Sequence, residues 1–438
     1  MSLLHRPDAQ VLLEDATASA QDVRGCAGRL TQFLARYLPL FGRAEQRDNA
    51  RLAIEGRLGG LERKTCEPIA READVPRRAL QRFVGAGQWD DEAVTSETRA
   101  EVTEELGDAR GVLALDPSSF PKKGTESCGV KRQWCGRLGK TDNCQVGVFL
   151  GYASAKGHVL VDRQLYLPED WSEDKARREK TYVPETATYQ PKWRIGLNLI
   201  RRSKAIPHAW ITGDDEFGRV TEFRKALRAD REHYVLDVPC NTLVRDLDER
   251  VRRRGRKGRW KPPFRRVAEW AKRQRDAGWQ EIEVRAGEKG PLKVKVLRAR
   301  VQTRSVGRLG AEETLVVIRT QEETPQTWYT LSDAAAAVPT TEIVRAHAER
   351  HRIEETFQEA KGEVGLADYE VRSWTGWRHH MTLCMLALLF VVLEQLRMGK
   401  KNSGRDGVAG ARDHRGPAAS SASDVPRDHA KSQRSVAA

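Results

Sequence analysis

The sequence predicts an α/β fold in which a mixed β-sheet is flanked by helices. Three observations support it: residues 1–98 have helical patterns, residues 112–212 follow the order strand, strand, strand, helix, strand, and residues 341–398 return to helices. The changes of pattern predict five parts: a helical N-terminal DNA-binding domain (1–105), the first part of the α/β core (106–240), a basic, β-rich insertion (241–335), the C-terminal core helices (336–400) and a tail (401–438).

The N-terminal part contains a candidate helix-turn-helix at residues 68–83. A short helix is expected to reach Ala73, a tight turn to hold Asp74, and Pro76 to occupy the first position of a second helix. The apolar residues expected to pack the two helices together are Ala70, Val75, Leu80 and Phe83. The residues expected to face outward toward DNA are Arg77, Arg78, Gln81 and Arg82. A plain helical hairpin in a larger bundle fits the same pattern.

Two aspartates follow short apolar strands. Residues 112–115 end on Asp116, and the strand at residues 208–212 is followed by Gly213 and Asp214. Strand ends are where a rigid sheet presents side chains to a ligand, although an aspartate there also commonly caps a turn. Asp116 and Asp214 are therefore candidate site residues.

Most of the positive charge lies in one segment. The chain has a net charge of +14 with 32% charged residues, a balance that favours a polyanionic partner, and nucleic acid is the usual one. Residues 250–275 contain thirteen Lys and Arg against the single acid Glu269, interleaved with aromatic residues. The DNA contacts expected there are Arg252, Arg253, Arg254, Arg256 and Lys257. Residues 279–332 then follow the pattern of a β-ribbon.

The helix predicted over residues 341–365 has a polar stripe beside its buried face. At ~100° per residue from His347, the angles are about 300° for Arg350, 340° for Glu354 and 320° for Lys361. The predicted core face consists of Ala346, Ile353, Phe357, Ala360 and Val364. Glu355, at about 80°, points elsewhere. Glu354 is therefore preferred over its neighbour as a site residue, although a solvated helix with i,i+4 ion pairs would show the same stripe.

The remaining features indicate a soluble protein of the cytoplasm. The seven cysteines form no CxxC pair, which is typical of reduced thiols. The most apolar run, residues 381–393, is shorter than the ~20 residues that span a bilayer, so a buried helix and no membrane are expected. Residues 402–438 have almost no large apolar side chain, and we expect that tail to be disordered.

The spacing His347-x2-Arg350-x3-Glu354-x6-Lys361 resembles the Tyr-x2-Arg-x3-Glu-x6-Lys signature of bacterial cut-and-paste insertion-sequence transposases. These belong to the DDE group, whose catalytic core is an RNase H-like mixed sheet flanked by helices. Further segments resemble family motifs: residues 115–124, 132–140, 143–147, 212–218 and 370–377. The resemblance covers roughly residues 45–395, with His347 standing where the signature has tyrosine.

The resemblance implies a DNA transposase with two divalent metal ions, Mg²⁺ or Mn²⁺. Asp116, Asp214 and Glu354 would hold the ions and be catalytic, while Arg350 and Lys361, with His347, would contact DNA phosphates. The partners would be double-stranded DNA, both element ends and target, bound by a homodimer near the nucleoid. Two ions ~3.5–4 Å apart require carboxyl groups that converge, so oxygen distances of about 3–7 Å are expected.

Two other functions share these features. An RNase H-like endonuclease or resolvase would cut without joining, and a catalytically decayed transposase would only bind DNA. An assay for strand transfer distinguishes the endonuclease from a transposase, because only the transposase joins strands. A decayed transposase is recognised by binding DNA without cleaving it.

The basic segment leads to a prediction about salt dependence. Neutralising Arg252, Arg253, Arg254 and Arg256 should lower the slope of log K against log salt by up to roughly 3–4, because each phosphate contact releases counterions. Affinity should fall about equally for any DNA sequence. Filter binding across a salt series measures the slope; an unchanged slope would mean that the segment is only a solvated surface.

Overall fold

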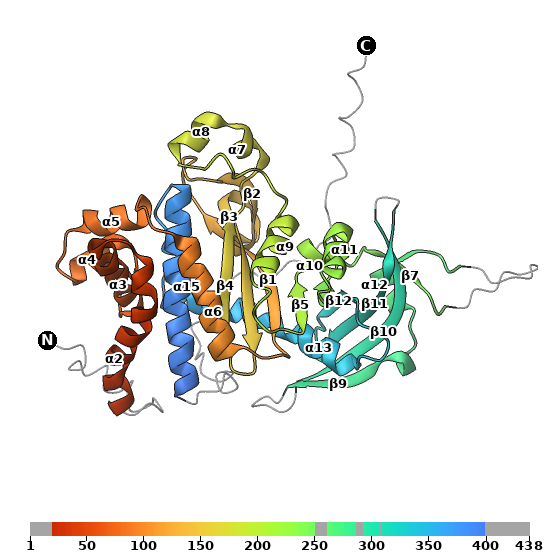
Figure 1. The fold of residues 1–438 in the computed structure, drawn as a ribbon. Helices are drawn as coiled ribbons and strands as arrows, with labels where there is room; N and C mark the ends of the chain where they lie inside the picture. The colour runs from red at the N-terminus through yellow and green to blue at the C-terminus, as the bar shows by residue number, and fades with distance from the viewer. Residues whose placement is uncertain (1–19, 250–260, 286–291, 306–307, 399–438) are drawn as a thin grey trace, which may run out of the picture.

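The computed structural model describes residues 20–249, 261–285, 292–305 and 308–398. The predicted α/β fold class is confirmed, because a large mixed sheet is flanked by helices (Figure 1). Several predictions lie outside the described residues: the contacts by Arg252, Arg253, Arg254, Arg256 and Lys257, and the disordered tail. The five-part division of the chain stays a prediction.

The N-terminal region is helical, as expected. Its helices are α2 (Ala20–Tyr37), η2 (Leu38–Leu40), α3 (Ala44–Leu58), α4 (Cys66–Glu72), α5 (Arg77–Gly85) and α6 (Asp91–Leu106). The Asp90 carboxylate caps α6 by accepting from the backbone N–H groups of Glu92 and Ala93. In Figure 1, α6 and α15 stand between the other N-terminal helices and the sheet.

The helices α4 and α5 and the turn between them lie where the sequence predicted them. Asp74 adopts a left-handed φ of 52°, and the outward residues Arg77, Arg78, Gln81 and Arg82 are exposed. Two details were wrong. Pro76 precedes α5 in an extended conformation instead of being its first residue. Val75 is 39% exposed, because its backbone N–H closes the end of α4 on Ala70 O, a cap that leaves its side chain in solvent.

The core sheet contains the predicted strands. They are β1 (Val112–Pro121), β3 (Lys140–Ser154), β4 (Gly157–Leu165) and β5 (Trp210–Gly213). Two further strands join them: β2 (Lys131–Cys135), which was not predicted, and β6 (Tyr234–Asp237). β1, β5 and β6 are parallel neighbours, and the other pairings are antiparallel. β1 does not end at Asp116 as predicted: it continues to Pro121 because β3 still pairs with it, whereas its pairing with β5 stops at Leu115.

Short helices connect these strands. They are η3 (Gly136–Leu138), α7 (Glu169–Glu173), α8 (Lys175–Lys180), α9 (Lys192–Arg202), α10 (Asp215–Gly218) and α11 (Thr221–Ala229). α9 is the helix predicted between the third strand and β5, and its apolar side packs on β3 and β4 through Ile195, Leu199 and Ile200.

The predicted β-ribbon is present and extends the core sheet. It contains β7 (Leu243–Asp246), β8 (Arg265–Arg266), β9 (Gln280–Arg285), β10 (Leu292–Ser305), β11 (Arg308–Thr320) and β12 (Thr327–Ser332), with α12 (Val267–Lys272) and η4 (Asp276–Gly278). β12 pairs with β6, so the ribbon and the core form one continuous sheet in the order β2-β3-β1-β5-β6-β12-β11-β10-β7-β8. The ribbon is thereby attached at the strand that ends on Asp237.

The helix predicted over residues 341–365 is two helices, α13 (Thr340–Glu349) and α14 (His351–Glu363). The break lies at Arg350, where backbone bonds run over three residues, from Arg350 to His347 and from Ile353 to Arg350. The two helices pack in different cores: Ile343 and Val344 of α13 join the ribbon's cluster, whereas Ile353 and Phe357 of α14 join the main one. A single straight helix would not place its apolar side chains in both of these clusters.

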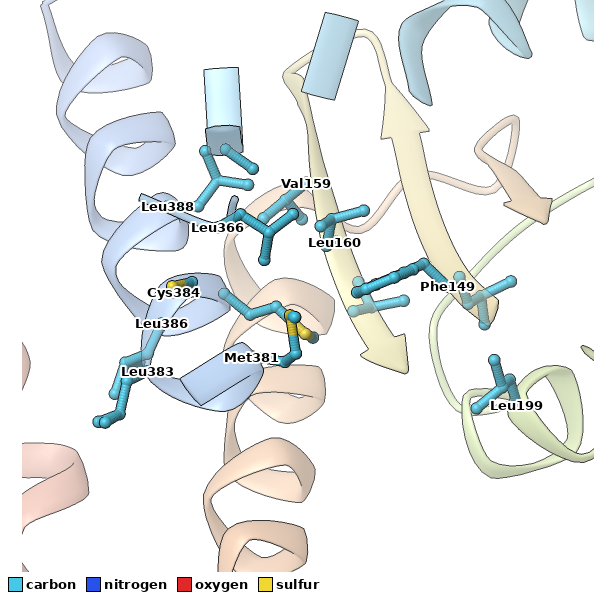
Figure 2. Packing of buried hydrophobic residues seen from close by; sticks show 14 of the residues in the cluster. Phe149, Val159, Leu160, Leu199, Leu366, Met381, Leu383, Cys384, Leu386 and Leu388 are labelled. Atoms are coloured by element: carbon cyan, nitrogen blue, oxygen red, sulfur yellow. The ribbon is translucent and has the colours of Figure 1, made fainter. Parts of the chain in front are cut away.

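The last helix, α15 (Trp374–Arg397), is the centre of the main core. Among the described residues it is the one helix long and apolar enough to cross a membrane, but 78% of its apolar window is buried inside the fold. It packs against α3, α5, α6 and β4. Figure 2 shows Met381 of α15 pointing toward Val159 and Leu160 of β4, whereas Leu383 and Leu386 point to the opposite side of the helix. This helix holds the N-terminal helices and the sheet together, as the predicted buried helix would.

Substitutions in α15 should therefore affect the stability of the whole fold. Leu386→Ala should lower the free energy of unfolding by roughly 2–5 kcal/mol, since a fully buried leucine leaves a cavity. Leu309→Ala, at an exposed position, should change it by less than about 0.5 kcal/mol. Urea denaturation followed by circular dichroism measures both; equal effects would argue against α15 as the centre of the core.

Candidate active site

Three aspartates occupy equivalent positions on three adjacent parallel strands. Leu115 of β1 pairs with Gly213 of β5, and Gly213 pairs with Leu236 of β6. The residues that directly follow these three aligned positions are Asp116, Asp214 and Asp237. Because β1 and β5 are parallel, Asp116 and Asp214 lie at the same edge of the sheet. Asp237 was missed, although it also follows a short apolar strand and could have been found by the same signal.

Asp116 and Asp214 line one cleft of about 960 Å³, together with Glu354 and Lys361 of α14. α14 packs on the sheet as expected: Phe357 makes an edge-on contact with Phe149 at 5.2 Å between ring centroids, and Gly151 leaves room for Ile353. Glu354 faces the cleft, whereas Glu355 lies 3.7 Å from His158 and does not line it. The structure thus brings the three predicted carboxylates and Lys361 to one cleft.

The two aspartates of the cleft have raised pKa values. Burial, reinforced by the charges of Asp214 and Glu354, raises the pKa of Asp116 well above its usual value. Burial and the neighbouring Glu216 and Asp215 raise the pKa of Asp214 to about 6. A carboxylate whose pKa is raised in this way lacks sufficient cationic partners, and a bound cation would supply them.

Glu354 has partners of its own. Its two oxygens lie 3.1 Å from His351 Nδ1 and 3.3 Å from Arg350 Nη1. The hydrogen bond from His351, together with the charge of Arg350, lowers the pKa of Glu354 despite partial burial. Within the described ranges, no three Asp, Glu, His or Cys side chains lie close enough together to hold one metal ion. The carboxylates therefore share a cleft while Glu354 is paired with its own helix.

The donor set fits a hard divalent cation. Asp116, Asp214 and Glu354 offer only carboxylate oxygens, the ligands that Mg²⁺ prefers alongside water and phosphate. The raised pKa values of the two aspartates also support a cation site, because a cation between them would favour their ionised forms. We regard these three residues as the ones that could hold the implied ions.

Of the other residues predicted to contact DNA, two lie beside the cleft and two lie on α5. His347 and Arg350 lie beside the cleft and contact Asp237, at 3.0 Å and 3.3 Å. Arg77 and Arg78 are exposed on α5 and are not part of the cleft lining.

The mouth of the cleft contains aromatic and basic side chains that sequence reasoning did not assign. Trp134 on β2 is 63% exposed and lines the cleft beside Arg137, and Tyr189, Lys192 and Trp193 line it from the α9 side. Exposed aromatic rings among cations are typical of surfaces that bind nucleic-acid strands. The alternation of basic residues around Trp134 was the available signal.

Comparison with known proteins gives a consistent result. The family described as DDE superfamily endonuclease matches residues 36–291, more than half of the chain. A segment of 102 residues is 33% identical to the "Probable transposase for insertion sequence element IS701" of Microchaete diplosiphon. This match covers 22% of the present chain and 27% of that relative, so it spans about a quarter of the relative's length.

The raised pKa of Asp214 leads to a prediction about pH. Its folded pKa of about 6 lies above the ordinary value of 3.8, so the folded state binds the proton more tightly between these values. The contribution of Asp214 to the free energy of unfolding should therefore rise as the pH falls from 7 toward 4, and the difference between wild type and the variant Asp214→Asn isolates it from the other titrating groups. Asp214→Asn should stabilise the protein without metal at pH 7, by on the order of 1–2 kcal/mol, and flatten that dependence.

Thermal melts from pH 4 to 8 in EDTA measure this effect. Glu322→Gln, which removes an exposed carboxylate outside the cleft lining, is the control and should keep the wild-type pH dependence. If Asp214→Asn were destabilising at pH 7, the carboxylate would have a cationic partner that the structure does not show.

Proposed function

The chain belongs to the DDE superfamily endonuclease family, and on that premise we propose that it is an insertion-sequence transposase that cleaves and joins DNA strands. The observation that carries the proposal is the single cleft lined by Asp116, Asp214 and Glu354. Two of these carboxylates come from adjacent strands and the third from a helix packed across them. Their raised pKa values support a cation-binding role for Asp116 and Asp214.

We assign the metal-binding role to these three residues. Asp116, Asp214 and Glu354 would each supply carboxylate oxygens to the ions. Two Mg²⁺ or Mn²⁺ ions would polarise the scissile phosphate and lower the pKa of the attacking hydroxyl. Glu354 would exchange its pairing with His351 for this role and keep its contact with Arg350, whose Nη2 group would donate to a phosphate.

Cationic residues around the carboxylates would bind the DNA backbone. Lys361 lines the cleft, and burial together with Arg137 lowers its pKa, so an approaching phosphate would favour its charged form. Arg350 and His347 would donate to phosphates on the other side of Glu354. At the mouth, Trp134 and Arg137 would hold the strand that enters the cleft.

The partners would be double-stranded DNA at the element ends and at the target. Arg77 and Arg78 on α5 present a cationic helix face of the kind that enters a major groove. Joining two ends to one target brings two active sites together, so a homodimer on DNA is the simplest assembly. With its apolar helix α15 buried in the fold, the protein would act at the nucleoid in the cytoplasm and not in a membrane.

The test of catalysis is substitution of each metal-binding residue. Asp116→Ala, Asp214→Ala and Glu354→Ala should each lower Mg²⁺-dependent cleavage of the element's own ends by at least about 1000-fold, on the scale of losing one essential catalytic group. DNA affinity, measured in Ca²⁺ by gel shift, should stay within a few-fold. A labelled duplex scored for cut and joined products measures both steps.

The matched control is Glu355→Ala, one residue along the same helix, which should cut at close to the wild-type rate. Loss of cleavage in Glu355→Ala but not in Glu354→Ala would refute the assignment. Cutting without joining by the wild type would favour an endonuclease, and binding without cutting would favour a decayed transposase.

A further inference from the structure

We propose that Asp237 is a positioning residue for the reaction: it holds His347 and Arg350 at the junction of α13 and α14 and so sets where Arg350 and Glu354 stand relative to the cleft. The inference rests on the proposed function. It concerns a carboxylate that is equivalent in register to the two metal-binding aspartates but has a different task.

The contacts of Asp237 distinguish it from Asp116 and Asp214. Its side chain is buried, with the residue 7% exposed, and it is not part of the cleft lining. Oδ1 accepts hydrogen bonds from His347 Nε2 at 3.0 Å and from the Thr330 hydroxyl at 3.2 Å. Oδ2 lies 3.3 Å from Arg350 Nε. Both oxygens are therefore engaged, so Asp237 is not a third aspartate available to a metal ion.

Asp237 is held as a buried anion. Burial alone would raise its pKa, but the charges of His347 and Arg350 and the hydrogen bonds from His347 and Thr330 keep the pKa below its usual value. Removing one member of such a buried charged set leaves the others unpaired. The cationic side chains at the helix junction therefore depend on this carboxylate.

The junction between the two helices is where an anchor is needed. His347 lies in the last turn of α13, Arg350 lies between the helices, and Glu354 lies in the first turn of α14. α13 packs in the ribbon core and α14 in the main core, and the two helices meet at Arg350. One carboxylate at that junction contacts both His347 and Arg350 and so connects its two sides.

The chain of contacts continues into the cleft. Arg350 reaches Asp237 with Nε and Glu354 with Nη1, each at 3.3 Å, so its guanidinium links the buried anion to the candidate metal ligand. Outer partners of this kind orient metal ligands, and losing one typically reduces affinity or activity by about 10–100-fold.

The backbone of Asp237 is also tightly placed. A Cβ on Gly218 would lie 1.8 Å from the carbonyl oxygen of Asp237, so only glycine permits this approach. Gly218 ends the short helix α10, which begins directly after Asp214. The segment that carries Asp214 therefore packs on the residue that anchors Arg350, and both sides of the cleft share one support.

The experiment is a double-mutant cycle between Asp237→Asn and Arg350→Gln, with cleavage of the element ends measured at saturating DNA and Mg²⁺. Asp237→Asn alone should lower the maximal rate by about 10–100-fold. In the Arg350→Gln background it should lower the rate by no more than about 3-fold, because residues that act through each other are not additive. A general structural role would instead give the same factor in both backgrounds.

The matched control is Asp333→Asn, which removes a carboxylate that pairs with His233 at 2.8 Å near the start of β6, opposite the Asp237 end. It should cut at the wild-type rate. Thr330→Val, which removes one donor to Asp237 and keeps the carboxylate, decides the case if Asp237→Asn does not fold. It should lower the rate several-fold, and only when Arg350 is present.

The possible failures are distinguishable. A wild-type rate for Asp237→Asn, or for a folded Thr330→Val where that variant decides, would overturn the positioning role, as would equal losses with and without Arg350. A wild-type protein that never cuts DNA would instead overturn the proposed function.

Discussion

The parallel pairing of β1, β5 and β6 in one register is the constraint on which the rest of the site depends. Because the three strands are hydrogen-bonded side by side, the residues that follow their apolar segments stand in one row. Three aspartates occupy that row, and a rigid sheet prevents them from separating to reduce their repulsion. The helices and the remaining strands bury these aspartates and supply the positive charges that offset part of their repulsion.

The three aspartates of this row have different surroundings, which give Asp237 a different role from Asp116 and Asp214. Asp116 and Asp214 open on the cleft and have few cationic partners, so their pKa values are raised. Asp237, one strand further, is covered by the α13–α14 junction and surrounded by His347, Arg350 and Thr330, so its pKa is lowered. Identical side chains at equivalent register positions thus acquire opposite electrostatic character, which suits two of them to a cation and the third to an anchor.

The two hydrophobic cores explain how the site is assembled from distant segments. α15 and β4 form the main core that carries α14, while the ribbon forms a second core that carries α13. The ribbon joins the sheet through β12 and β6, the strand that ends on Asp237. Arg350 lies between the helices of the two cores and beside the cleft, so the ribbon takes part in the structure around the site.

Local patterns in the sequence were sufficient for the fold class and for most of the order of strands and helices along the core, and they selected Asp116, Asp214 and Glu354, which line one cleft. These features depend on apolar periodicity over a few residues, which one segment expresses by itself. Only the tertiary structure decided that β1 continues past Asp116, that Val75 faces solvent, that the helix breaks at Arg350, and that Asp237 completes the row. Apart from the exposure of Val75, which follows from a local helix cap, each of these features depends on a partner far away in the chain, such as β3, the ribbon or α13. Pairing at that distance leaves no periodic pattern in the sequence.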